Sequence, residues 1–373
     1  MRFLGTFRFI TLVISVFISQ FPEKNFSSSC IYRNNNWPKA VVDFRIKLID
    51  TNTVKKYHNY VNKAELSTLD GNFMLASSYY DTCFSLPVMH FAQDIYNASI
   101  CALENGDYRK SVKYCLRLVE KGCKKEFFLK KAYNGLRSNK SYWNHFQNEY
   151  EKHRGLYKKN VDTLLLGKLK KMVLADQSYF CEMPGRLKDN NFLDSLFQND
   201  QYLSNQLSLL FEKYGYISEE LIGVNVVDTT LSIYPIYNVL IRHHYQLKQY
   251  ELTNILKRAV YEGKLKPDIF CNWYSFEKRP VGYGDELFIL KYKCNLYEAR
   301  RSGVRELIEK NRKQMWLSPL DDLKKKIIYR SSVDNARYIY YAPLAVIPDM
   351  NEDSEKNFKM KNSTLPNIPI GCK

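Results

Sequence analysis

The chain has 373 residues, of which 45% are hydrophobic and 25% are charged. This composition excludes disorder or a collagen-like structure for the bulk of the chain, and the length is typical of about two or three domains. Lys and Arg outnumber Asp and Glu by 56 to 39, which gives a net charge of +17, and an AT-rich coding bias would account for part of this excess.

Residues 1–29 have the pattern of an export signal. Arg2 and Arg8 precede an apolar stretch at 9–19, and no acidic residue comes before it. The stretch is shorter than the about 20 apolar residues that a membrane-spanning helix needs. We therefore expect 1–29 to be a signal peptide or membrane-targeting segment, and the protein to be exported to a bacterial periplasm or cell envelope. An uncleaved anchor, or lipid attachment at Cys30, is the alternative.

A period of 35 residues marks the first half of the chain. The turn-like segments Asp70-Gly71-Asn72-Phe73 and Asn105-Gly106-Asp107-Tyr108 are 35 residues apart, and each is followed by a helical pattern. Small residues also recur at this offset, since Ala64 is matched by Ser99 and Ala76 by Ser111, and they would let paired helices approach closely. A third copy, with the turn Ser138-Asn139-Lys140, lacks the glycine and is degenerate. The pattern predicts a helix, a short polar turn and a second helix, repeated.

The stretch Tyr96–Gly122 resembles a tetratricopeptide repeat in its small–aromatic spacing and its Gly-Asp-Tyr turn. The resemblance covers about residues 55–155 and implies helical hairpins with a concave groove for a protein or peptide. A hairpin scaffold without a ligand is an equally open interpretation. We assign 37–157 to these tetratricopeptide-like repeats. The candidate binding residues are Tyr79, Tyr114, Lys121, Lys124, Lys125 and Trp143.

Positive charge is concentrated in residues 106–175, which hold 18 Lys and Arg against 6 Asp and Glu. A nucleic-acid interface would combine such a patch with exposed aromatic residues. Tyr142, Trp143 and Tyr150 lie nearby, but at the spacing of a helical core. A solvated face, or a face toward anionic lipid or polysaccharide, is therefore favoured over nucleic acid.

Helical periodicity also dominates the second half, so the fold class is predicted to be all-α, with one short strand near 287–292. Gly215 and Gly263 are typical helix stop signals. We expect a second α-helical domain at 158–345 and an irregular tail at 346–373. The predicted helices are 161–177, 202–214, 234–247, 250–262 and a basic helix at 298–315.

His243 is the candidate catalytic residue, because it lies on the apolar face of the helix predicted at 234–247. An inward histidine is more often a hydrogen-bonded core residue than a catalyst. The glycine-rich loop at 280–286 would supply Tyr283 and Glu286, but it lacks the spacing of a phosphate-binding or dinucleotide-binding loop. The nine cysteines form no CxxC and no zinc-ligand pattern, so neither a metal site nor a cofactor is predicted.

A series of short segments occurs in order through the second half: Asp176-Gln177, Tyr214-Gly215-Tyr216, Ile222-Gly223, Leu240-Ile241-Arg242-His243-His244, Lys257-Arg258-Ala259-Val260, Tyr283-Gly284 and Leu317-Ser318-Pro319-Leu320. In these segments the chain resembles a bacterial family of uncharacterised domains over about residues 161–330. That resemblance implies an α-helical fold and an exported context in gut-type bacteria, and it implies no activity because the family has none assigned.

Three functions follow from these patterns, in order of preference. The first is an exported binding or scaffold protein that uses its helical repeats to bind a protein or peptide rather than a small molecule. The second is a hydrolase-like enzyme in which His243 acts as general acid or base and the Tyr283 loop orients it. The third is a binder of nucleic acid or anionic surfaces through residues 106–175. Association with a membrane or envelope is expected through the N-terminal segment.

Overall fold

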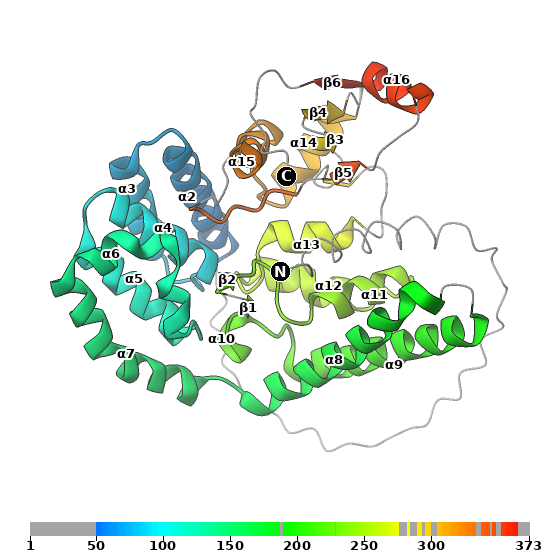
Figure 1. Cartoon of the computed structure of the whole chain (residues 1–373), viewed down its shortest axis with the longest axis horizontal. Helices are drawn as coiled ribbons and strands as arrows, with labels where there is room; N and C mark the ends of the chain where they lie inside the picture. The colour runs from blue at the N-terminus through cyan, green and yellow to red at the C-terminus, as the bar shows by residue number, and fades with distance from the viewer. Residues whose placement is uncertain are drawn as a thin grey trace. The chain divides into compact units, whose positions relative to one another are not determined.

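The fold of the described residues is mainly α-helical, with short strands in the second half (Figure 1). The all-α fold class is therefore confirmed. No helix among these residues is long and apolar enough to cross a membrane. The predicted export segment at 1–29, and Cys30 with it, lies outside the described residues. The computed structural model describes residues 50–186, 189–227, 229–275, 282–283, 289–292, 295–299, 304–332, 337–343, 345–347 and 352–364, which belong to one compact unit, Leu48–Lys373.

Two equivalent helical hairpins open the described chain. Gly71 and Gly106 each adopt a φ of 73°, a left-handed conformation that glycine reaches without a steric cost. The next residue then caps the second helix of its hairpin: the side chain of Asn72 accepts from the amide of Leu75, and that of Asp107 from the amide of Lys110. The 35-residue offset is thus a repeat of turn geometry. The four helices are α2 (Thr51–Leu69), α3 (Phe73–Phe84), α4 (Ala92–Glu104) and α5 (Tyr108–Glu120).

The third hairpin is irregular, as its degenerate turn predicts. Two 3₁₀ turns, η2 (Lys125–Leu129) and η3 (Lys131–Tyr133), and the short α6 (Asn134–Ser138) occupy the place of its first helix. Aromatic packing accounts for the break, because the fully buried ring of Phe128 contacts Phe146 on the second helix with 4.8 Å between centroids. That second helix, α7 (Lys140–Asn160), is regular and packs against α5.

The predicted helices of the second half are present, with shifted ends. Gly215 and Gly263 end two of them with a φ of 68° each. At Gly263 an added Cβ would lie 3.2 Å from a methyl carbon of Val54, so this glycine also lets α2 approach closely. The helices are α8 (Thr163–Arg186), α9 (Asn190–Tyr214), α11 (Asn238–Gln246) and α12 (Leu252–Tyr261), with α10 (Glu219–Ile222) and the short strands β1 (Val226–Val227) and β2 (Thr230–Leu231) between α9 and α11.

The strand predicted near 287–292 is found as β3 (Ile289–Tyr292), but the basic helix predicted at 298–315 begins too early. Its first residues belong to β4 (Asn295–Ala299), which pairs antiparallel with β3, and the helix α14 spans only Arg305–Gln314. Pairing with β3 buries Leu296 and Tyr297, and this burial overrides the helical pattern of the segment.

The segment from 346 onward is more regular than expected. The strand β5 (Ala345–Ile347) pairs parallel with β3, and β6 (Asn362–Thr364) pairs antiparallel with β4. Between them, α16 (Glu352–Lys361) places Phe358 against Tyr292 and Tyr297. The sequence shows little sign of this helix, because Phe358 is its one aromatic residue and most of its other side chains are charged.

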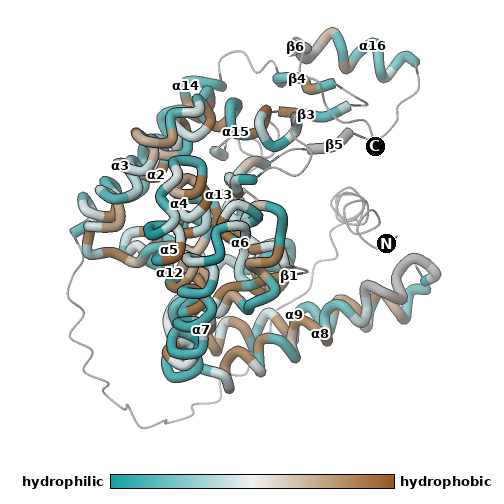
Figure 2. The backbone as a smooth tube through the Cα atoms, turned by 60° about the vertical axis from the view of Figure 1, so that its left-hand side comes forward, coloured by the Kyte–Doolittle hydropathy of each residue, from teal (hydrophilic) through white to brown (hydrophobic). Residues whose placement is uncertain are grey.

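The hydrophobic core of the described residues has two large parts that meet at one extended segment, and a small third cluster of Leu290, Tyr292 and Tyr297 lies beside Phe358. One part lies among α2–α7, and the other among α8, α9, α11–α13 (Pro267–Tyr274 is α13) and α15 (Leu320–Ser332). In Figure 2, hydrophilic and hydrophobic residues alternate along α8 and α9, as expected for helices with one buried face. Residues 337–343, here named the strap, place Tyr338 and Tyr340 in the first part and Tyr341 in the second.

Candidate functional sites

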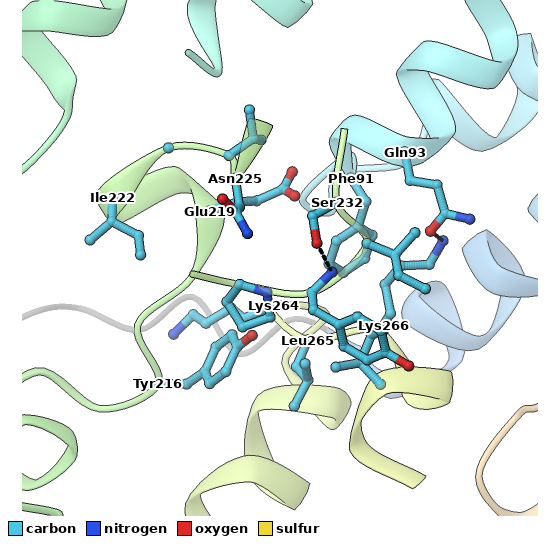
Figure 3. A pocket seen from close by; sticks show the side chains of 16 residues that line it. Phe91, Gln93, Tyr216, Glu219, Ile222, Asn225, Ser232, Lys264, Leu265 and Lys266 are labelled. Carbon is cyan, nitrogen blue, oxygen red and sulfur yellow. Dashed lines mark hydrogen bonds between the residues drawn. The ribbon is translucent and has the colours of Figure 1, made fainter. Parts of the chain in front are cut away.

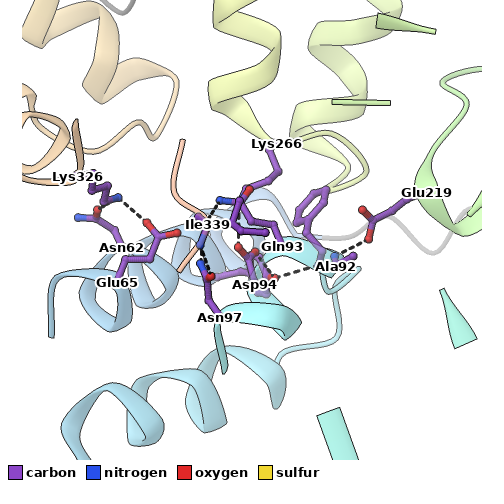
Figure 4. Close-up of polar contacts among 12 residues, drawn as sticks. Asn62, Glu65, Ala92, Gln93, Asp94, Asn97, Glu219, Lys266, Lys326 and Ile339 are labelled. Atoms are coloured by element: carbon purple, nitrogen blue, oxygen red, sulfur yellow. Dashed lines mark hydrogen bonds and ion pairs between the residues drawn. The ribbon is translucent and has the colours of Figure 1, made fainter. Parts of the chain in front are cut away.

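A buried ion pair joins the first hairpins to the second half of the chain. Lys266, in the loop before α13, donates from Nζ to Asp94 Oδ1 at 2.8 Å and to Gln93 Oε1 at 3.0 Å (Figure 4). Asp94 is fully buried on α4, and its other oxygen accepts from the hydroxyl of Tyr57 at 2.8 Å. A buried charge is costly unless it is paired and hydrogen-bonded. Here every charged atom of the pair has such a partner.

Two more ion pairs surround this one. We call the three ion pairs together the junction. Lys326 on α15 lies 2.6 Å from Glu65 on α2, with both side chains buried. Glu219 on α10 accepts from the Ala92 amide at 2.8 Å, at the start of α4, and pairs with Lys121 at 2.9 Å. A carboxylate at the positive end of a helix is favourable. The junction therefore fixes α2 and α4 against three separate elements of the second half.

Electrostatics keep the central lysine charged. Burial by itself lowers the pKa of Lys266, but the negative charges of Asp94 and Glu65 outweigh it and raise that pKa above its ordinary value. Burial has the opposite sign for an acid, and it raises the pKa of Glu65 against the pull of Lys326. Lys266 is therefore buried as a cation, and carboxylates on two helices of the first half, α4 and α2, balance its charge.

The strap crosses α4 and is held there by main-chain hydrogen bonds. Asn97 uses both ends of its side-chain amide: Nδ2 donates to the carbonyl of Ile339, and Oδ1 accepts from the amide of the same residue, each at 2.8 Å. Gln93 donates to that carbonyl as well, and the hydroxyl of Tyr96 donates to the carbonyl of Arg337. Four such bonds to backbone atoms hold an extended segment in the way that a groove holds a peptide.

The inner face of α2 and α4 is therefore closed by the chain itself. In the structure it carries the strap, the buried lysines of the junction and the hydroxyl of Tyr340, which lies 2.5 Å from that of Thr68. A partner that used this face would first have to displace residues of the protein's own core.

Acidification is expected to destabilise the protein through His58, which is buried on α2 beside the junction. Burial, helped by the positive charge of Lys266, lowers the pKa of His58 to about 3, and Asp94 opposes this only in part. An unfolded histidine titrates near 6.5, so the stabilisation from neutral His58 is present above that pH and is lost as the pH falls toward 3.

Between pH 7 and pH 5, this loss amounts to about 2 kcal/mol of unfolding free energy. Urea unfolding at the two pH values measures it, and we expect the difference to shrink by a similar amount in the variant His58→Gln. The same pH dependence in variant and wild type would contradict the assignment.

A small pocket lies beside the junction (Figure 3). Its wall is made by the start of α4, by α10 with the chain that follows it, and by the loop before α13. Its charged side chains already have partners in the protein: Glu219 pairs with Lys121, Lys264 with Glu262, and Lys266 with Asp94. The pocket therefore offers a ligand little uncompensated charge.

His243 lies between two aspartates that come from two other helices. Its Nδ1 atom is 2.9 Å from Asp176 Oδ1 on α8 and 3.3 Å from Asp200 Oδ1 on α9. Asp176 is fully buried, and the side chain of His243 is 10% exposed. Burial lowers the pKa of His243, but the hydrogen-bonding and charge of the two aspartates overcome it and raise the pKa to about 9. The side chain of His243 therefore points into the protein interior, as the helical pattern predicts.

The neighbouring His244 lies between a serine and a glutamate, as the histidine of a catalytic triad does. The serine hydroxyl is too buried for a substrate to reach it. The Nδ1 atom of His244 is 2.7 Å from Ser204 Oγ, and its Nε2 atom is 3.4 Å from Glu251. However, Ser204 is only 1% exposed and is also bonded to Gln249, and burial lowers the pKa of His244. A substrate has no approach to a hydroxyl in that position, so we interpret the group as core hydrogen bonding.

The proposed partners of His243 in the 280–286 loop remain a prediction. Tyr283 packs its ring near that of Tyr274, at 6.2 Å between centroids, and its carbonyl accepts from Arg312. Glu286 lies outside the described residues. The contacts that define His243 in the structure are those with Asp176 and Asp200, two residues that the sequence did not single out as ligands or catalysts.

The predicted binding residues differ in their exposure and in their contacts. Tyr114 is buried and donates to Asp81, and Lys121 is engaged with Glu219. Trp143 is half-buried and stacks on Phe146. The rest differ in the same way: Tyr79 is half-buried near Tyr60, whereas Lys124 and Lys125 are exposed at the start of η2.

The junction residues were missed because their signal is not local. Asp94 and Lys266 are 172 positions apart, and neither stands in a motif. A weak hint was available in α4, where the pattern of polar residues Gln93, Asp94 and Asn97 on an otherwise apolar helix indicates buried polar partners. Nothing in the sequence identifies those partners.

The two family resemblances stay predictions after comparison with known proteins. No protein-family model, no curated protein and no solved structure matches the chain. The coarser statement holds: the described first half consists of packed helical hairpins, as helical repeats would.

Proposed function

We propose that the protein is an exported binding or scaffold protein, built on tetratricopeptide-like hairpins, that receives a protein partner on its outer surface. The inner face of α2 and α4 is filled by the strap and the junction, so it leaves no open groove there. The 35-residue spacing and the two equivalent turns at Gly71 and Gly106 support the repeat assignment. The N-terminal pattern at 1–29 supports export.

The surface proposed for the partner lies on the consecutive helices α7 and α8. Its exposed lysines and leucines are the main support for the proposal. Exposed lysines and exposed leucines occur on both helices, and none of these lysines makes an ion pair within the described part of the chain. Leu164 is 86% exposed and Leu174 is 69% exposed. The α7–α8 surface consists of Lys158, Lys159, Lys168, Lys170 and Lys171 with Leu156, Leu164 and Leu174.

This mixture favours a protein with acidic and apolar side chains over a purely anionic surface. Unpaired lysines attract an acidic partner from a distance and set the orientation of the encounter. Large exposed leucines gain little from contact with a phosphate or a sugar, but they are typical of the part of an interface that becomes buried. The lysines would then form the rim of the interface and the leucines its centre.

Affinity capture with the mature chain tests the proposal. The wild type is expected to retain a partner whose binding weakens as salt rises. Reversing the charge at Lys158, Lys159, Lys168 and Lys171 to Glu should reduce capture of that same partner by about 10-fold or more, and Leu164→Asp should weaken it independently of salt.

The matched control reverses Lys55 and Lys56, which are exposed on α2. It should leave capture unchanged. Equal capture by the wild type and the α7–α8 variant, or an equal loss in the α2 control, would overturn the proposal. Circular dichroism on each variant confirms that the helices remain folded.

A further inference from the structure

Three helices each present one potential metal ligand to a common point. Asp176 comes from α8, Asp200 from α9 and His243 from α11. Their ligand atoms all lie within 4.8 Å of one another, and His243 Nδ1 is 2.9 Å and 3.3 Å from the two carboxylate oxygens. Ligands bound to one ion at about 2.0–2.2 Å lie at separations of this size.

A second observation separates this group from an ordinary surface cluster. Asp176 is completely buried, yet its Oδ1 atom accepts no hydrogen bond of good geometry within the described part of the chain, although His243 Nδ1 lies 2.9 Å away. The same holds for Oδ1 of Asp200, which lies 3.3 Å from that nitrogen. A buried carboxylate oxygen without a well-formed hydrogen bond is costly. The other oxygen of Asp176 accepts from Gln177 at 2.6 Å, so Oδ1 is the oxygen that faces His243.

We propose that Asp176, Asp200 and His243 form a binding site for a divalent transition-metal ion, Zn²⁺ or Mn²⁺. Two carboxylates carry more negative charge than one imidazole can compensate in any protonation state, so a cation between them is favoured. One nitrogen and two oxygen donors suit these ions, whereas Mg²⁺ and Ca²⁺ prefer oxygen ligands alone.

The number of ligands and their exposure define the kind of site. Three protein ligands leave at least one coordination position for water, unlike the closed four-ligand sites that only stabilise a fold. Asp200 is the most exposed of the three side chains, at 19%, although its Oδ1 atom is buried. The inference is independent of the partner surface on α7 and α8.

Metal binding by the purified full chain tests the proposal. After chelator treatment, isothermal titration with Zn²⁺ and with Mn²⁺ should show one saturable site for at least one of them, and Mg²⁺ and Ca²⁺ should bind more weakly. Asp200→Asn keeps the size of the side chain at the least buried ligand, and it should weaken binding by about 10-fold or more.

The matched control is Glu149→Gln, because His153 also lies near two carboxylates, those of Glu120 and Glu149, but on the surface. This variant should bind metal as the wild type does. Absence of saturable binding, unchanged affinity in Asp200→Asn, or a preference for Mg²⁺ or Ca²⁺ would overturn the proposal.

A spectroscopic measurement covers the case in which Asp200→Asn fails to fold. Co²⁺ added to the wild type should give visible absorption bands that Zn²⁺ abolishes, without the near-ultraviolet band of a thiolate ligand. A thiolate band would place the metal on one of the nine cysteines instead, and it would overturn the assignment.

Discussion

Replacing Asp94 with alanine is expected to lower the free energy of unfolding by about 3–5 kcal/mol, the largest effect that we predict for a single substitution. The variant leaves the ammonium group of Lys266 buried with only Gln93 as a partner, and it removes the acceptor of the Tyr57 hydroxyl. Asp94 lies on α4 and Lys266 in the second half, so the loss should affect both parts of the core in one transition.

Urea unfolding followed by circular dichroism and by fluorescence measures this loss. The double variant Asp94→Leu with Lys266→Met should recover much of it, because apolar side chains of similar volume often replace a buried ion pair without a net cost. Glu149→Ala is the control, since its partner Lys152 is 73% exposed and such pairs contribute about 0–1 kcal/mol. A loss below about 1 kcal/mol for Asp94→Ala would contradict the role assigned to the junction.

Replacing Asn97 with alanine is expected to cost about 2–4 kcal/mol, the second largest effect. The carbonyl of Ile339 would keep its bond from Gln93, but the amide of Ile339 would lose its acceptor within the core. The strap should then become accessible, because the same substitution removes the side chain that holds both of its main-chain groups.

Limited proteolysis checks this second prediction, with cleavage at residues 337–343 expected to be faster than in the wild type under conditions in which the helices remain folded. Asn144→Ala, an exposed asparagine on α7, serves as the matched substitution and should change neither stability nor cleavage. If cleavage in the Asn97→Ala variant stays confined to other loops, the strap does not depend on Asn97.

Local features of the fold were predictable from the sequence because their causes are local. The turns at Gly71 and Gly106 need a left-handed residue followed by a capping side chain, and both requirements are visible in the letters Gly-Asn and Gly-Asp. The amphipathic stripes of α8 and α9 are likewise visible, since one face of each helix is buried. A periodic hydrophobic pattern and a helix stop signal are enough to predict such elements from the sequence.

Contacts between distant segments were not predictable in the same way. The helix predicted at 298–315 includes residues 298 and 299, yet pairing with β3 makes them the end of the strand β4. The strap contains Tyr338 and Tyr340 in a stretch that resembles a loop, and its place is determined by Asn97 in another part of the chain. Such choices depend on tertiary burial, which a single sequence does not display.

The candidate sites follow the same rule. His243 was identified because its inward position on a helix is a local property. Asp176 and Asp200 were not identified as its partners, because each comes from a different helix and none of the three residues lies in a short metal-binding motif. The side chains that define the site are brought together only by the packing of α8, α9 and α11.

Hydrogen exchange in the wild-type chain measures directly whether the strap closes the α2–α4 face. The amide of Ile339 donates to Asn97, so we expect it to exchange as slowly as the amides of α4, with the free energy of global unfolding as the limit. Rapid exchange of the Ile339 amide while α4 remains protected would show that the α2–α4 face is open. A partner could then bind on that face, and the proposal that it binds on α7 and α8 would be contradicted.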